Sequence, residues 1–168
     1  LYQMGDTGPV ADACTRIAGR LEETGIEKLI VGCVNCKKVF AQHMDQVDVS
    51  HVIEVLPTDI LKELPEDEDL YLHHPCPLYH VDGIREKTAA VLGHPRLLDD
   101  VDEQKIPACC GYGGSLNTQD EELSKKFTER VTMAAYGASI VTSCMGCNNM
   151  FNKKGTPTYH ILELITGV

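Results

Sequence analysis

Five of the eight cysteines in this chain follow one regular spacing, and this spacing constrains the fold more than any other feature. A single cysteine is followed after 32 residues by an adjacent pair, and after a further 33 residues by a Cys-x-x-Cys sequence. Five thiols exceed the four ligands of a tetrahedral zinc site and suit iron–sulfur chemistry, in which thiolate ligands dominate. We therefore expect the fold to bring five sulfurs to one place: Cys76, Cys109, Cys110, Cys144 and Cys147.

The adjacent pair continues as Cys-Cys-Gly-Tyr-Gly-Gly over residues 109–114. With its flanking cysteines, this pattern resembles the CCG cysteine-rich domain family. That family includes heterodisulfide reductase and the iron–sulfur subunits of anaerobic glycerol-3-phosphate dehydrogenase, glycolate oxidase and lactate-utilisation enzymes. The resemblance is best over residues 67–168 and is closer to the hydroxyacid-oxidase branch. That branch reads His-Asp-Pro-Cys-His, whereas residues 73–77 here read His-His-Pro-Cys-Pro, so the second family histidine is missing.

The resemblance implies that the five cysteines bind a 4Fe-4S cluster of a non-cubane type. It also implies an oxidoreductase subunit or domain. Such a chain passes electrons between a partner flavoprotein dehydrogenase, of the 2-hydroxyacid or glycerol-phosphate type, and a quinone or electron-carrier subunit. The heterodisulfide branch implies another activity, in which the cluster cleaves a disulfide. A third interpretation is a zinc-stabilised interaction module without redox activity, in which zinc takes four of the five thiols.

Composition and charge exclude several other classes. The formal net charge of −10 disfavours nucleic acid as a partner, because such affinity comes largely from basic side chains. No apolar run is long enough to span a membrane, and the sequence does not begin with a secretory signal. Eight cysteines without a signal indicate a reducing compartment. We therefore expect a cytoplasmic chain that reaches a membrane only peripherally, through its complex; a disulfide framework is the alternative.

The chain contains an internal repeat. Residues 29–36 and 140–147 are both short apolar runs that end in Cys-x-x-Cys, and residues 51–56 echo residues 160–165. The offsets are 111 and 109 residues, which indicates duplication. By the same offset, a first Cys-Cys-Gly would fall just before residue 1. We therefore interpret residues 1–66 as the C-terminal part of a first repeat, truncated at its N-terminus, and residues 67–168 as a complete second repeat.

Strands and helices alternate in each repeat, which predicts an α/β fold with mostly parallel sheets. The expected cysteine ligands follow the strands, at the sheet edge where α/β proteins bind ligands. Two helices carry apolar stripes at helical spacing: Val10, Cys14, Ile17 and Leu21 in one, and Leu123, Phe127 and Val131 in the other. The expected helices are residues 9–24, 37–44, 58–64, 83–92 and 119–136, and the expected strands are residues 27–32, 70–73, 105–108 and 139–143.

The remaining cysteines and the histidines give weaker signals. On its stripe, Cys14 is expected in the core. Cys33 and Cys36 are interpreted as half of a second metal site, or as a disulfide if they are oxidised. No catalytic residue is assigned beyond the ligand set. His51 and His160 recur in both repeats, which indicates capping or packing. Three histidines flank Cys76, and the alternatives are that one of them donates a hydrogen bond to a cluster sulfur or relays protons, or that they lie on the surface: His73, His74 and His80.

Overall fold

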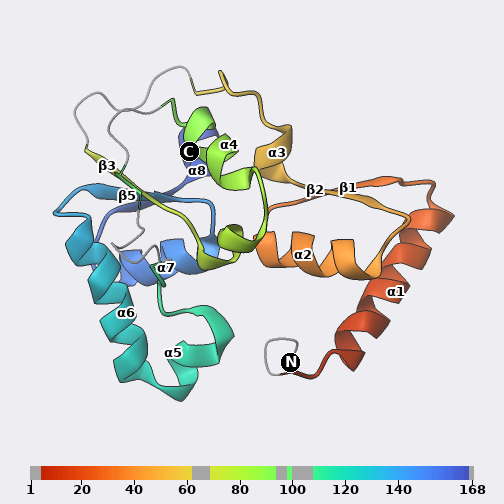
Figure 1. Cartoon of the computed structure of the whole chain (residues 1–168), viewed down its shortest axis with the longest axis horizontal. Coiled ribbons are helices and arrows are strands. Elements are labelled where there is room, and N and C mark those ends of the chain that lie inside the picture. Colours follow the sequence, from red (N-terminus) through yellow and green to blue (C-terminus); the bar gives the residue numbers. More distant parts are fainter. Residues whose placement is uncertain (1–4, 62–68, 94–97, 100–107, 167–168) are drawn as a thin grey trace. The chain divides into compact units, whose positions relative to one another are not determined.

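The computed structural model describes residues 5–61, 69–93, 98–99 and 108–166 (Figure 1). The chain divides into two compact units, Leu1–Val55 and Leu56–Val168. Each unit has its own parallel sheet, whose strands alternate with helices, so the expected α/β class is confirmed. The sequence-based repeat boundary at residues 66–67 and most of the expected strand at residues 105–108 lie outside the described residues.

In the N-terminal unit, two strands pair in parallel, with Leu29 opposite Val49. The expected core position of Cys14 is confirmed, since it is 1% exposed and packs with Ala18, Met44, Val47 and Val49. The expected stripe is wrong at Ile17, which is 37% exposed, because the buried face runs through Ala18 instead. The elements are α1 (Gly8–Glu23), β1 (Lys28–Val31), α2 (Val34–His43), β2 (Asp48–His51) and α3 (Val52–Val55).

The C-terminal unit has a four-stranded parallel sheet with the order β4-β3-β5-β6. The expected strands at residues 70–73 and 139–143 and the expected helix at residues 83–92 are confirmed. The strands are β3 (Leu70–His73), β4 (Leu98–Asp99), β5 (Ser139–Thr142) and β6 (Thr158–His160). The helices are η2 (Cys76–His80), α4 (Ile84–Val91), η3 (Gly113–Ser115), α5 (Leu116–Gln119), α6 (Glu121–Ala134), α7 (Met145–Lys153) and α8 (Ile161–Thr166).

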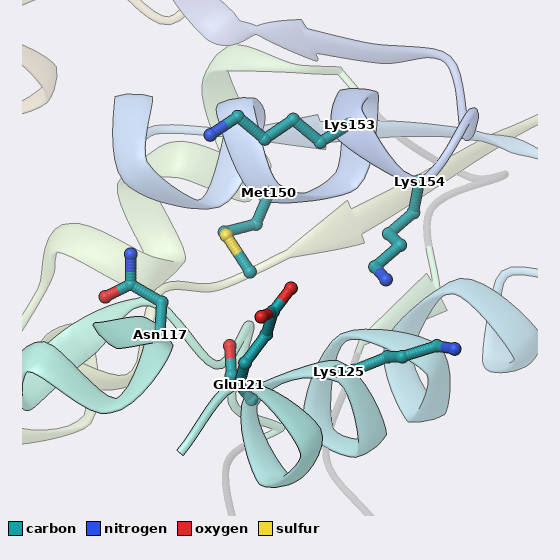
Figure 2. Close-up of a pocket in the computed structure, with 7 residues that line it drawn as sticks. Asn117, Glu121, Lys125, Met150, Lys153 and Lys154 are labelled. Atoms are coloured by element: carbon teal, nitrogen blue, oxygen red, sulfur yellow. The ribbon is translucent and has the colours of Figure 1, made fainter. Parts of the chain in front are cut away.

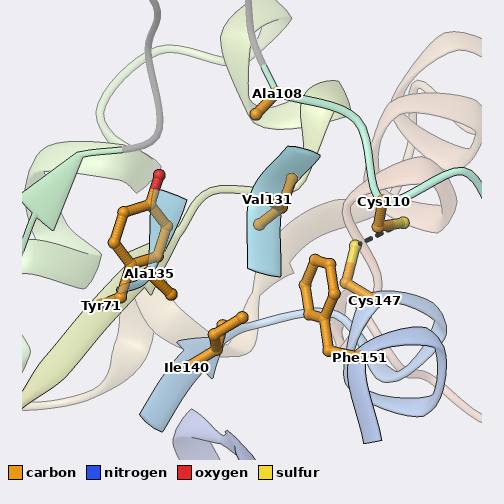
Figure 3. Close-up of a cluster of buried hydrophobic side chains, with 8 residues drawn as sticks. All are labelled: Tyr71, Ala108, Cys110, Val131, Ala135, Ile140, Cys147 and Phe151. Carbon is orange, nitrogen blue, oxygen red and sulfur yellow. Dashed lines mark hydrogen bonds between the residues drawn. The ribbon is translucent and has the colours of Figure 1, made fainter. Parts of the chain in front are cut away.

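Helices cover both faces of this sheet: α7 lies on one face, and α4 and α8 lie on the other (Figure 1). All four residues of β3 are buried, and so are the last three of β5, as expected for parallel strands covered on both sides. Figure 3 shows the main cluster on the α7 side. Its members are Tyr71, Ala108, Cys110, Val131, Ala135, Ile140, Cys147 and Phe151. Two of the expected metal ligands therefore form part of the hydrophobic core.

The two Cys-x-x-Cys segments have the same local structure. In both units a strand ends, one residue follows, and a cysteine in extended conformation caps a helix. The cap φ and ψ are −129° and 125° at Cys33, and −131° and 118° at Cys144. Each strand then pairs with the next one in equivalent register, Leu29 opposite Val49 and Ile140 opposite Thr158. These matched elements support the duplication inferred from the sequence.

The two recurring histidines, His51 and His160, each cap a short helix. Of the two roles expected from the sequence, capping and packing, the structure thus shows capping. Nδ1 of His51 accepts the Ile53 N–H at 3.3 Å, while the Glu54 carboxylate accepts the His51 N–H at 2.6 Å. In the C-terminal unit, Nδ1 of His160 accepts the Leu162 N–H at 3.3 Å, and Glu163 accepts the His160 N–H at 2.5 Å. Both arrangements are capping boxes in which histidine takes the place of serine or threonine.

Two helix predictions need correction. The helix expected at residues 58–64 is absent from residues 58–61, which are turn and coil, and the chain forms the capped helix α3 earlier. The helix expected from residue 37 begins at Val34, so Cys36 lies in its first turn instead of in a loop. A cysteine cap lets the helix start at once, because the extended cap residue already accepts the first intrahelical bond. In the described part of the chain, no helix is long and apolar enough to cross a bilayer.

Candidate metal centre

Two neighbouring strands carry the first and last expected ligand segments to one edge of the sheet. β3 and β5 pair in parallel, with His73 opposite Thr142. Cys76 follows three residues after the end of β3, and Cys144 follows two residues after the end of β5. Because the carboxyl ends of parallel strands meet at one edge, these two cysteines belong to the same part of the molecule.

The five sulfurs are linked into one group. The Cys147 thiol donates to Sγ of Cys110 at 3.1 Å, the contact drawn in Figure 3. Cys147 also donates to Cys144, and Cys76 donates to Cys109. The charges of Cys110 and Cys144 also raise the pKa of Cys76. The structure thus places Cys110 against Cys147 and gives electrostatic interactions that connect Cys76, Cys109 and Cys144 with them, while the binding of metal by all five stays a prediction.

The start of α7 lowers the pKa of Cys144 to about 6. The largest cause is the hydrogen bond from the Cys147 thiol, and the backbone N–H groups of Gly146 and Cys147 add to it, whereas burial acts in the opposite direction. These N–H groups belong to the first turn of the helix and have no partner within it. A thiolate at residue 144 is therefore stabilised by the same geometry that starts the helix.

The pKa of Cys109 is also lowered to about 6. The Cys76 thiol donates to it, and the Gly111 N–H donates to its sulfur at 3.3 Å; burial opposes both effects. The pKa of the donor, Cys76, is raised by its bond to Cys109, by burial and by the nearby thiolates. The pKa of Cys147 is raised as well, by its hydrogen-bonding interactions with Cys110 and Cys144, by burial and by the charges of both residues. These shifts favour the thiolate form at Cys109 and Cys144 and the thiol form at Cys76 and Cys147.

The structure separates the three histidines that flank Cys76. His73 is fully buried and meets the Phe151 ring edge-on, with the centroids 4.9 Å apart. Its charge helps to lower the pKa of both Cys109 and Cys144. His74 is buried as well, whereas His80 is exposed. His73 is therefore the histidine placed to act on the sulfurs, and His80 fits the surface interpretation.

Two hydroxyls that the sequence analysis missed hold the Cys-Cys-Gly turn against α6. Ser124 Oγ donates to the Gly111 carbonyl at 2.9 Å, and Thr128 Oγ1 donates to the Cys110 carbonyl at 2.8 Å. Both residues are at most 2% exposed, while the expected stripe residue Leu123 is 41% exposed. The expected stripe is therefore confirmed at Val131, whereas at its other positions the buried face runs one residue later, through Ser124 and Thr128. The available signal was the spacing of Ser124, Thr128, Val131 and Ala135, which share one helical face.

Replacing Thr128 with valine is expected to destabilise the C-terminal unit by about 1–3 kcal/mol, because a buried carbonyl loses its donor while the side-chain shape is kept. Urea unfolding of the reduced, metal-free protein measures this loss. Thr132→Val is the matched control, since the Thr132 hydroxyl donates only within α6, to the Glu129 carbonyl. Equal stability of the two variants would mean that Thr128 does not hold the turn.

The number and type of the donors, five thiols, fit an iron–sulfur cluster. Within the residues that the structure describes, no three His, Cys, Asp or Glu side chains are already arranged to hold one metal ion. Two sulfurs on the same zinc, each at about 2.3 Å, would lie roughly 3.8 Å apart. The Cys110–Cys147 distance of 3.1 Å is shorter than this, so these two thiols are not spaced to bind one zinc ion. Five thiols from three segments, two of them favouring thiolate, are nevertheless the ligand chemistry that iron–sulfur clusters use.

The second Cys-x-x-Cys is an exposed pair. Cys33 caps α2, Cys36 lies in its first turn, and both are exposed. Burial, the Cys33 charge and a hydrogen bond between the two thiols raise the pKa of Cys36 to about 11. The pair has the geometry of Cys144 and Cys147, but no further cysteine of the described N-terminal unit joins it, since Cys14 lies in the core.

A separate cavity of about 260 Å³ lies between α6 and α7, over Met150 (Figure 2). Lysines dominate its charged lining, with Glu121 pointing into it from α6. No cysteine lines it, so it is distinct from the thiol group. The lining residues are Asn117, Glu121, Ser124, Lys125, Met150, Lys153 and Lys154.

Comparison with known proteins agrees with this geometry. Residues 70–152 match the CCG cysteine-rich domain family, and the match includes all five linked cysteines. Across 182 aligned residues, the chain is 26% identical to one of the subunits of fumarate reductase (CoM/CoB) from Methanothermobacter marburgensis. The alignment covers 98% of this chain but only 37% of that relative. Cys33 and Cys36 fall inside the aligned chain but outside the matched family region.

Proposed function

We propose that this chain, whose residues 70–152 match the CCG cysteine-rich domain family, is an iron–sulfur subunit or domain of an oxidoreductase. In this proposal, Cys76, Cys109, Cys110, Cys144 and Cys147 hold a 4Fe-4S cluster, which supplies one-electron redox chemistry when bound. The chain passes electrons between a partner flavoprotein dehydrogenase, of the 2-hydroxyacid or glycerol-phosphate type, and a quinone or other carrier.

The observation that carries the proposal is the linking of five sulfurs from three separate chain segments. A structural zinc site needs only four ligands. Since one backbone step joins Cys109 and Cys110, the pair can supply two sulfurs to neighbouring irons. The chain's own N–H groups also point at the sulfurs, from Gly111 to Cys109 and from Gly146 to Cys144. Hydrogen bonds of this kind tune the reduction potential of a cluster.

The two sides of the thiol group have different roles in this proposal. Cys110 and Cys147 are 6% and 4% exposed, so they anchor the centre in the core and keep water from it. Cys76 is exposed, and Cys109 and Cys144 are partly exposed. A partner or substrate therefore approaches from the Cys76 side. His73, buried behind the thiolates, is placed to stabilise negative charge there.

A second candidate function is disulfide cleavage. The relative from Methanothermobacter belongs to a fumarate reductase whose name includes CoM/CoB, and the family resemblance extends to heterodisulfide reductase. In such a reaction, two electrons and two protons convert one disulfide into two thiols, and the reverse reaction releases them. The exposed sulfur side would admit a disulfide. The chain spans 37% of that relative, so the remaining parts of such an enzyme would supply the electron source or acceptor.

A test of the function uses the chain reconstituted anaerobically with iron and sulfide and then reduced with dithionite. The electron-carrier proposal predicts that a quinone analogue reoxidises the protein and that a small disulfide yields no thiol. Formation of two thiols per disulfide would instead establish the second function. If the chain bound zinc instead of iron and its visible spectrum did not change on reduction, both redox functions would be wrong. The zinc-stabilised interaction module would then be the function.

A further inference from the structure

One aromatic side chain joins the two loops that carry the buried sulfurs. A methyl group built on Gly146 would lie 2.9 Å from Cδ1 and 3.3 Å from Cε1 of Tyr112, so the ring packs directly on the Gly146 backbone. Tyr112 follows the Cys-Cys-Gly turn, and Gly146 lies inside the Cys144–Cys147 turn. The ring therefore spans the two segments whose sulfurs meet at 3.1 Å in the Cys110–Cys147 pair.

This contact lies at the boundary between the core and solvent. Tyr112 is 47% exposed, although its ring packs on Gly146, and neighbouring Met145 is 55% exposed. The sulfurs of the bridged loops are nearly inaccessible, at 6% and 4% for Cys110 and Cys147. Tyr112 therefore packs one side of its ring on the glycine that precedes buried Cys147, while the rest of the side chain faces water.

We propose that Tyr112 is a positioning residue that shields the Cys110–Cys147 pair and limits the access of water, oxidants and thiol reagents to it. The ring does this through its contact with Gly146. Its hydroxyl takes no part, because the atoms that touch Gly146 are ring carbons. The absence of a side chain at residue 146 is as necessary as the ring, since any Cβ there would displace the ring. The relevance to cluster protection rests on the proposed function, but the shielding itself does not.

The test measures alkylation of each cysteine by mass spectrometry in the reduced, metal-free chain. Tyr112→Ala should speed the alkylation of Cys110 and Cys147 by more than threefold, on the order of tenfold, and leave exposed Cys33 unchanged. Tyr112→Phe should behave like the wild type. Gly146→Ala should speed alkylation as Tyr112→Ala does, and the double variant should match Tyr112→Ala alone, because the two changes remove one contact.

A further control variant separates the loss of shielding from a general loss of stability. Val131→Ala weakens the core cluster that contains Cys110 and Cys147 but leaves Tyr112 and Gly146 unchanged, so it reports the effect of lost stability without loss of the ring. At equal loss of unfolding free energy, the Tyr112→Ala effect must exceed the Val131→Ala effect. A rise below threefold in Tyr112→Ala, a rise matched by Val131→Ala, or additive effects in the double variant would each overturn the proposal. None of these outcomes depends on bound metal, so failure here is separate from failure of the iron–sulfur assignment.

Discussion

Replacing Gly111 with alanine is expected to destabilise the C-terminal unit by about 2–6 kcal/mol. Gly111 has φ +81°, a left-handed conformation that costs other residues about 1–3 kcal/mol. A methyl group there would also lie 2.4 Å from the Ser124 carbonyl oxygen, and overpacking adds roughly 1–3 kcal/mol. Because the free energy of unfolding of a whole domain is only about 5–15 kcal/mol, this single methyl group can remove a large part of the stability of the C-terminal unit. Urea unfolding of the reduced, metal-free chain measures the loss.

The same loop supplies two matched controls. Gly113 has nothing within 4 Å of an added methyl group and no positive φ, so Gly113→Ala should cost little. Gly114 has equally open space but φ +65°, so Gly114→Ala should show the backbone cost alone. The expected order of damage is Gly111, then Gly114, then Gly113. If Gly111→Ala were no worse than Gly114→Ala, the close packing of the turn against α6 would be wrong.

Loading the protein with metal is expected to produce the largest change in stability. The five cysteines extend from Cys76 to Cys147 and join three segments that otherwise meet through thiol hydrogen bonds. Structural metal binding can contribute on the order of 10 kcal/mol to a small domain. Amides of residues 109–117 should therefore exchange hydrogen far more slowly in the reconstituted protein than in the metal-free one.

The amides of the N-terminal core serve as the internal control for this measurement. Cys14 and Met44 belong to a separate unit with its own packed cluster, so their exchange should not respond to metal at the five cysteines. Equal protection of residues 109–117 with and without metal would show that the metal does not organise the turn. That result would favour the interpretation of the chain as an interaction module, because a turn that is already ordered without metal does not depend on a cluster.

The sequence predicted the parts of the fold that repeat or alternate strongly. Helices α1 and α6 followed from hydrophobic periodicity, and the equivalence of the two Cys-x-x-Cys segments followed from the 111-residue offset. The placement of Cys76 and Cys144 in one region followed from their positions after two strands, because the carboxyl ends of paired parallel strands meet at one sheet edge.

Other features depended on tertiary contacts that no local pattern reveals. On α6, the buried face carries Ser124 and Thr128, which look like surface residues until their hydroxyls meet the carbonyls of Gly111 and Cys110. On α1, the small Ala18 is buried and the larger Ile17 is partly exposed, since the space available decides which side chain fits. Among the histidines near Cys76, only burial distinguished His73 from His80.

The central claim is that five cysteines bind an iron–sulfur cluster, and a count of bound metal tests it most directly. Iron, zinc and acid-labile sulfide should be measured in the chain reconstituted without oxygen, beside Cys110→Ser, Cys147→Ser and, as the control, Cys14→Ser. The account predicts about four irons and four sulfides per chain in the wild type and in Cys14→Ser, and a marked loss in the two site variants. One zinc per chain with no sulfide, or full iron content in Cys110→Ser and Cys147→Ser, would contradict it.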